Sequence, residues 1–123
     1  MYEIEVFSNF SAAHRLRDYK GKCENIHGHN WKVGVTISIA KLDKIGIAVD
    51  FGDVKRQLKE ILKKFDHKNL NGLAYFRRVN PTSENLARFI YEQLKKRLPV
   101  SSVSVWEAED SKATYYLEGT PHW

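Results

Sequence analysis

The feature that most constrains the fold is a change in the spacing of apolar residues near the middle of the chain. Between residues 31 and 39, apolar side chains occupy every second position: Trp31, Val33, Val35, Ile37 and Ile39. A period of two is typical of a strand with one buried face. From residue 51 the apolar positions follow one helical stripe instead: Phe51, Val54, Leu58, Ile61, Leu62 and Phe65. This change predicts a sheet packed against a helix.

The remaining elements follow from the same patterns. Alternating residues at 2–6 predict a first strand, and the β-rich pattern continues after Asp43 through residues 45–49. Pro81 and Thr82 open a second helix, which Pro99 ends. Strands at 102–108 and 113–118, joined by a turn at 109–112, complete the chain. The predicted order is strand, strand, helix, helix, strand, strand.

We therefore predict an α+β fold in which an antiparallel four-stranded sheet carries two helices on one face. The 123 residues fit a single domain, 1–123, which leaves little room to enclose a deep pocket. A site shared between subunits is therefore plausible, and the second face of the sheet needs cover from another subunit or from a ligand.

Charge and cysteine content narrow the class of protein. The net charge of +5 is compatible with a nucleic acid, a phosphorylated small molecule or only a solvated surface, and basic residues that alternate with apolar ones on the two helices favour the last. The single cysteine, Cys23, has no partner for an intrachain disulfide and suits a reducing compartment. With no signal peptide and no membrane-spanning apolar run recognised, we expect a cytoplasmic protein without membrane or nucleic-acid partners.

Residues 23–29 form the most informative segment, Cys-Glu-Asn-Ile-His-Gly-His. If the strand already includes His27 and His29, both imidazoles point to one face, and His14 near the end of the first strand can reach them. Three neutral histidines and one open position are the usual form of a catalytic zinc site. A His-x-His pair alone is also compatible with ordinary surface or core histidines, and Cys23 with a fourth ligand, a catalytic thiol or a buried apolar residue.

Two further groups are candidates for chemistry. Asp66 and His67 follow the first helix and can form a proton relay, or merely cap the helix end. Glu107 lies between Trp106 and Ala108 on a late strand. Such a carboxylate can bind two N–H groups of a guanidine-like ligand edge, or form a structural salt bridge.

These residues resemble the 6-pyruvoyl-tetrahydropterin synthase family, which includes the 6-carboxytetrahydropterin synthases of queuosine-type pathways. The resemblance runs along nearly the whole chain through six motifs: residues 10–14, Cys-x-x-x-His-Gly-His at 23–29, and residues 49–53, 65–71, 80–85 and 106–107. Together they imply the tunnelling fold (T-fold), with the ββααββ order. They also imply sheets joined into barrels, commonly as a homohexamer built from two trimers, with active sites between subunits.

The resemblance also implies the role of each matching residue. His14, His27 and His29 match the ligands of one zinc ion per subunit, Cys23 the general base, and Asp66 and His67 its relay partners. Glu107 matches the carboxylate that binds the amino-pyrimidine edge of the pterin, and Thr82 and Ser83 lie in a motif near the pterin pocket. No motif identifies the residues that hold the triphosphate, for which the basic candidates are Lys20, Lys22, Arg77 and Arg78.

The family substrate is 7,8-dihydroneopterin triphosphate, and the resemblance leaves three products open. The cysteine favours conversion to 6-carboxy-5,6,7,8-tetrahydropterin, and the nearest rival is the 6-pyruvoyl product, formed by elimination of triphosphate. Because Glu24 stands beside Cys23, the segment also resembles relatives that use a glutamate to cleave the side chain to 6-hydroxymethyl-dihydropterin, a folate precursor. A hypothesis of another class is a non-catalytic basic binding module, which the charge supports but no nucleic-acid motif does.

Overall fold

Two long antiparallel strands, β1 (Tyr2–His14) and β2 (His27–Ile39), form the main part of the sheet. The computed structural model describes residues 1–21 and 24–120. The sheet continues from β2 to β4 (Val100–Ala108) and β5 (Ser111–Tyr115), all antiparallel. A two-residue strand, β3 (Lys68–Asn69), pairs in parallel with β1, so the strand order is β3-β1-β2-β4-β5. The predicted antiparallel four-stranded sheet thus has a fifth, parallel strand that no periodicity indicated.

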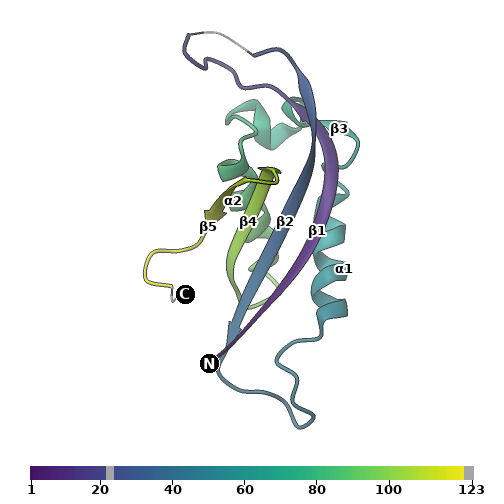
Figure 1. Ribbon diagram of the computed structural model, residues 1–123, viewed down its shortest axis with the longest axis vertical. Helices are drawn as coiled ribbons and strands as arrows, with labels where there is room; N and C mark the ends of the chain where they lie inside the picture. The colour runs from purple at the N-terminus through teal and green to yellow at the C-terminus, as the bar shows by residue number, and fades with distance from the viewer. Residues whose placement is uncertain (22–23, 121–123) are drawn as a thin grey trace.

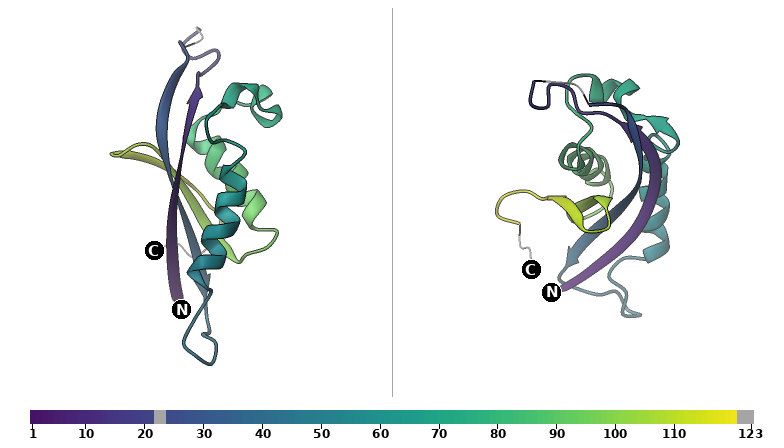
Figure 2. Two further views of the ribbon diagram at one scale, coloured as in Figure 1. Left: turned by 90° about the vertical axis from the view of Figure 1, so that its right-hand side faces the viewer. Right: turned by 45° about the horizontal axis from the view of Figure 1, so that its top comes forward.

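Both predicted helices form and lie on the same face of the sheet (Figures 1 and 2). Helix α1 (Phe51–Leu62) begins after Asp50, whose carboxylate accepts a hydrogen bond from Gly52 N. Helix α2 (Ser83–Leu94) begins after Thr82, whose hydroxyl accepts from Asn85 N. These side chains satisfy N–H groups that a helix start leaves unpaired. The predicted α+β class, with two helices on one face, is confirmed.

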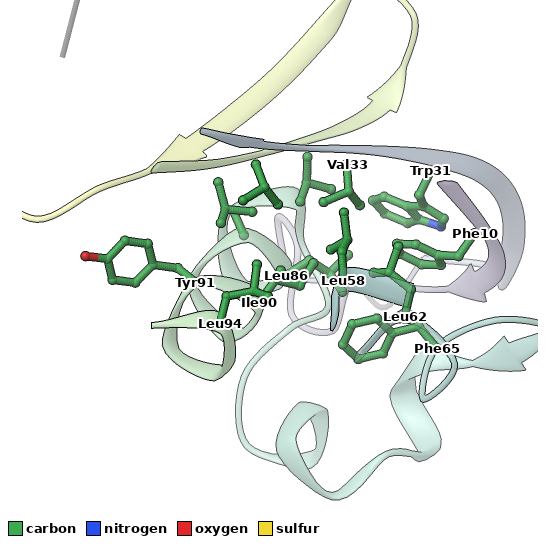
Figure 3. Packing of buried hydrophobic residues seen from close by; sticks show 14 of the residues in the cluster. Phe10, Trp31, Val33, Leu58, Leu62, Phe65, Leu86, Ile90, Tyr91 and Leu94 are labelled. Carbon is green, nitrogen blue, oxygen red and sulfur yellow. The ribbon is translucent and has the colours of Figure 1, made fainter. Parts of the chain in front are cut away.

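The core lies between the helices and the sheet (Figure 3). Trp31, Val33 and Val35 of β2 are fully buried there, together with Leu58 of α1 and Ile90 of α2. Phe10 stacks on Trp31, with ring centroids 5.8 Å apart and nearly parallel planes. The period-two run therefore faces the helices, as the sequence predicted. No helix in the described part of the chain is long and apolar enough to span a bilayer.

The β-rich pattern predicted at 45–49 is wrong, because residues 40–50 form turns and irregular chain. Asp43 accepts hydrogen bonds from Ile45 N and Ile47 N, each 2.9 Å long, and Gly46 has a φ of 85°. Ile45 is 78% exposed and Ile47 is 39% exposed, whereas Val49 is partly buried and packs against the core. Two short 3₁₀ helices, η1 (Leu70–Gly72) and η2 (Ala74–Arg77), lie in the segment between α1 and α2.

Candidate metal centre

The pairing of β1 with β2 brings the three histidines together. His14 lies opposite His27 in the register, and His29 lies opposite Ala12. Side chains alternate along a strand, so His27 and His29 share the face of Trp31, and His14 shares the face of the buried Phe10 and Ala12. The sequence prediction that these imidazoles converge is confirmed. The ring centroids are 4.7 Å apart for His14 and His27, and 4.8 Å for His27 and His29.

Glu107 of β4 completes this cluster. One potential ligand atom from each of His14, His27, His29 and Glu107 lies within 4.8 Å of the other three. Glu107 Oε1 lies 3.2 Å from His29 Nε2, and Glu107 Oε2 lies 3.8 Å from His14 Nε2. We predicted a ligand-binding role for Glu107, and the structure adds that its carboxylate borders the histidine cluster.

Backbone carbonyls orient two of the rings. His14 Nδ1 lies 2.7 Å from the Pro81 carbonyl oxygen, and His27 Nδ1 lies 2.9 Å from that of Asn25. A carbonyl only accepts, so each ring donates from Nδ1 and, when neutral, keeps its lone pair on Nε2. A carbonyl that fixes the tautomer from behind is the usual support of a histidine ligand.

The inner nitrogens lack hydrogen-bond partners. His14 Nε2 and His29 Nε2 are buried, and no described residue forms a hydrogen bond with either. For a neutral His14, the lone pair on Nε2 faces an acceptor-only carboxylate, and this arrangement is unfavourable unless a cation lies between them. His29 and Glu107 attract each other only with a proton or a metal ion between them. Three imidazoles and one carboxylate are ligands that suit zinc or a similar late divalent metal.

Burial keeps His14 ready to bind a metal. Its side chain is almost fully buried, and this desolvation lowers the pKa of His14 below its usual value. The Pro81 carbonyl and the Glu107 carboxylate act in the opposite direction but are smaller effects. A metal ligand must be the neutral imidazole, and a lowered pKa favours that form at neutral pH.

Asp66 and His67 form an ordered pair beside the cluster. Asp66 Oδ1 accepts a hydrogen bond from Ser11 N and lies 3.1 Å from His67 Nδ1, and the Ser11 N–H lowers the pKa of Asp66. His67 has a φ of 58°, and its own N–H donates to the Ser11 carbonyl. Its imidazole is 82% exposed and lies outside the four-residue cluster. A shallow hollow of about 530 Å³ is nevertheless lined by both His29 and His67.

The other predicted site residues have different surroundings. Glu24 accepts from Leu16 N through Oε1, and its own N–H donates to the Leu16 carbonyl, so its carboxylate fastens the loop between β1 and β2. Thr82 caps α2, and Ser83 is the first residue of that helix. Cys23 and Lys22 lie outside the described residues. Sequence reasoning missed the Pro81 carbonyl and the polar residues around it, because no local pattern reports contacts across more than 60 positions.

Comparison with known proteins gives consistent results. A family model described as 6-pyruvoyl tetrahydropterin synthase matches residues 3–118. A protein of Archaeoglobus fulgidus, provisionally named 6-carboxy-5,6,7,8-tetrahydropterin synthase, is 43% identical over 89% of this chain and 91% of its own length. Human 6-pyruvoyl tetrahydrobiopterin synthase is 37% identical over 87% of this chain and 86% of its own. The structure of 6-pyruvoyl tetrahydropterin synthase from Caenorhabditis elegans superimposes with a TM-score of 0.84 at 30% identity, covering 95% and 96% of the two chains.

Proposed function

Because the chain belongs to the 6-pyruvoyl tetrahydropterin synthase family, we propose that it converts 7,8-dihydroneopterin triphosphate into 6-carboxy-5,6,7,8-tetrahydropterin with the help of zinc. This reaction would place it in a queuosine- or archaeosine-type 7-deazapurine pathway. The observation that carries the proposal is the cluster of His14, His27, His29 and Glu107, in which two buried imidazole nitrogens have no other partner.

The three histidines would hold one zinc ion per subunit through their Nε2 atoms. Zinc bound there would act as a Lewis acid on the side-chain hydroxyls of the substrate and lower their pKa. The Pro81 and Asn25 carbonyls keep two of the rings in the tautomer that this binding needs. Glu107 would accept hydrogen bonds from the amino-pyrimidine edge of the pterin, because two carboxylate oxygens match two adjacent N–H groups.

Proton transfer is assigned to the chain's own acid–base groups. We assign the role of general base to Cys23 and that of relay to His67, which Asp66 orients through its contact with Nδ1. Thr82 and Ser83, at the start of α2, would contact the pterin. The triphosphate would be held by basic residues, for which Lys20, Lys22, Arg77 and Arg78 are the candidates.

The shape of the site favours an assembly. The hollow beside His29 and His67 is shallow, and the helices leave one face of the sheet uncovered (Figure 2). A neighbouring subunit would deepen the hollow and cover that face, so we propose a homohexamer made of two trimers whose sheets join into barrels. Light scattering tests this: a mass of six chains is expected, and a monomer at working concentration would contradict it.

The single unpaired cysteine supports a cytoplasmic location.

The nearest alternative is the 6-pyruvoyl product, which the name of the human relative supports. The carboxy product is supported by the name of the Archaeoglobus fulgidus relative, which is 43% identical. The 6-hydroxymethyl product would need Glu24 as a base, and this carboxylate is engaged with Leu16 N. A non-catalytic basic binding module has less support, because every residue to which the family motif assigns chemistry is present.

The product test is incubation of the zinc-loaded protein with 7,8-dihydroneopterin triphosphate, followed by mass identification of the pterin. The carboxy product is expected, and either of the other pterins would overturn the assignment. Cys23→Ala is expected to retain zinc and lose turnover, while unchanged turnover would exclude Cys23 as the base. Salt-dependent binding of RNA without turnover of any pterin would favour the binding module instead.

A further inference from the structure

The three residues that follow His14 are each held by a pair of hydrogen bonds. Each residue both donates from its backbone N–H and accepts at its carbonyl: Arg15 with the side chain of Asn71 (2.8 and 3.0 Å), Leu16 with Glu24 (3.1 and 2.9 Å), and Arg17 with the side chain of Asn80 (2.9 Å each). Three consecutive residues outside a strand or helix are thereby fixed by groups from three other segments. Such complete pairing restricts a loop that would otherwise be free to move.

The third of these pairs continues into a larger network. The guanidinium of Arg17 donates to the carbonyls of Phe76, Arg77 and Val79, and its Nε donates to Asn80 Oδ1. The Asn80 carbonyl in turn accepts from Asn85 Nδ2 of α2 at 2.8 Å. The segment before Pro81 is therefore held by side chains from both directions.

This network ends at the cluster of His14, His27, His29 and Glu107. Asn80 is bonded covalently to Pro81, whose carbonyl lies 2.7 Å from His14 Nδ1. Because His14 is almost fully buried and also packs edge-on against Trp31, its ring orientation depends on the place of that carbonyl. Any shift of residues 79–81 would move the group that keeps the His14 proton on Nδ1.

We propose that Asn80, through its bonds to Arg17, is a positioning residue for the metal centre. Asn80 holds the Pro81 carbonyl in place, and this carbonyl fixes the tautomer and orientation of the His14 ring. This inference rests on the proposed metal site and adds to it a residue that touches neither metal nor substrate. Asparagine suits the role because the site needs an amide that donates to the Arg17 carbonyl and accepts from Arg17 N and Nε.

The chain supplies a matched control. Asn71 binds the backbone of Arg15 as Asn80 binds that of Arg17, with two hydrogen bonds of similar length. Asn71 is not adjacent to a residue whose carbonyl contacts a histidine of the cluster. Asn71→Ala therefore removes the same kind of backbone clamp without moving the partner of His14, and it isolates the role proposed for Asn80.

The test is titration of the metal-free full chain with Co²⁺, which reports affinity and, through its visible d–d absorption, ligand geometry. Asn80→Ala is expected to weaken Co²⁺ binding by about 10–100-fold, the usual effect of losing an outer-shell partner, and to change the d–d bands. Asn71→Ala is expected to change the affinity less than about threefold on the same scale. Asn80→Asp retains the acceptor and loses the donor, so its effect is expected to be intermediate, and it serves if Asn80→Ala does not fold.

A second readout does not depend on metal. The NMR chemical shifts of the imidazole nitrogens report which nitrogen carries the proton. In the metal-free wild type they are expected to show the His14 proton on Nδ1. In Asn80→Ala or Asn80→Asp they are expected to show a mixture of the two tautomers. Equal effects of the Asn71 and Asn80 variants on affinity and tautomer would overturn the positioning role alone. A wild type that binds no Co²⁺ would overturn the proposed metal site and, with it, this inference.

Discussion

The two ends of the β1–β2 ribbon, at the top and bottom of Figure 1, differ in burial and in the range of their hydrogen bonds. At the end that carries His14, polar groups are buried and paired over long sequence distances, as in the bond from His14 to Pro81. At the other end, the loop at residues 40–50 exposes Ile45, and Asp43 turns the chain by accepting hydrogen bonds from Ile45 N and Ile47 N.

This difference distinguishes the candidate metal site from a loop that only connects β2 to α1. At the histidine end, the buried inner nitrogens of His14 and His29 are left without partners while the groups around them are held firmly. Unpaired buried polar groups are costly, so these two nitrogens support the proposal that a cation binds here. At the opposite end, one aspartate and one glycine with positive φ are enough to turn the chain.

The largest expected effect tests the histidine end. His29→Ala removes one of three proposed imidazole ligands, so zinc affinity should fall by more than the roughly 10–100-fold that an outer-shell change costs. Zinc content of the purified variant, measured by atomic emission, is expected to drop from about one per chain toward zero. His67→Ala is the control, because this side chain lies outside the cluster and the variant should retain zinc. Equal zinc content in both variants would contradict the assignment of ligands.

A somewhat smaller effect is expected at Asp66, which orients His67. Asp66→Asn keeps the shape but removes the charge, and turnover should fall by about 10²-fold, the lower end of what a positioned acid–base group contributes. Steady-state rates with zinc-saturated protein measure this. Wild-type rates in the variant would remove the pair from the mechanism.

The same variant makes a pH-dependent prediction about stability. The Ser11 N–H lowers the pKa of Asp66 in the folded state, so the folded protein binds this proton less readily than the unfolded chain. The stabilisation is therefore present above the ordinary aspartate pKa and is lost as pH falls through the lowered folded-state value. Melting temperatures of wild type and Asp66→Asn should differ most at neutral pH and converge in acid. A gap that widens in acid would contradict this linkage.

At the opposite end the expected effects are local. Asp43→Ala removes two turn hydrogen bonds and should lower the free energy of unfolding by about 1 kcal/mol, a typical net value for an exposed polar contact. Asp43→Asn retains an acceptor and should recover most of the loss. Denaturant unfolding measures the free energy, and zinc affinity should be unchanged. A loss of zinc binding in Asp43→Ala would show that the two ends are coupled.

The smallest effect is expected for Ile45→Ser. Its side chain is largely exposed, so the free energy of unfolding should change by less than about 0.5 kcal/mol, as for most surface substitutions. Val33→Ser, a buried change of the same kind, should be strongly destabilising. An Ile45→Ser variant as unstable as Val33→Ser would mean that the loop is packed in the folded protein.

Elements with a strong apolar period could be predicted from the sequence. Strand β2 and both helices occur where alternation or a helical stripe placed them, because burial of one face imposes the period. The same reasoning failed for residues 45–49, because Asp43 closes a turn there and leaves Ile45 exposed, although Val49 packs against the core. The two-residue strand β3 is too short to carry a period and forms only because it lies beside β1.

From the sequence one could predict that His27 and His29, two positions apart on one strand, present two imidazoles on the same face. How the imidazoles are held depends on contacts that form when the chain packs. His14 is oriented by a carbonyl 67 positions away, and Glu107 reaches the cluster because β4 lies next to β2. The physical reason is the range of the interaction. Alternation along a strand is a local consequence of backbone geometry, whereas a hydrogen bond between distant segments exists only after the sheet and helices have packed.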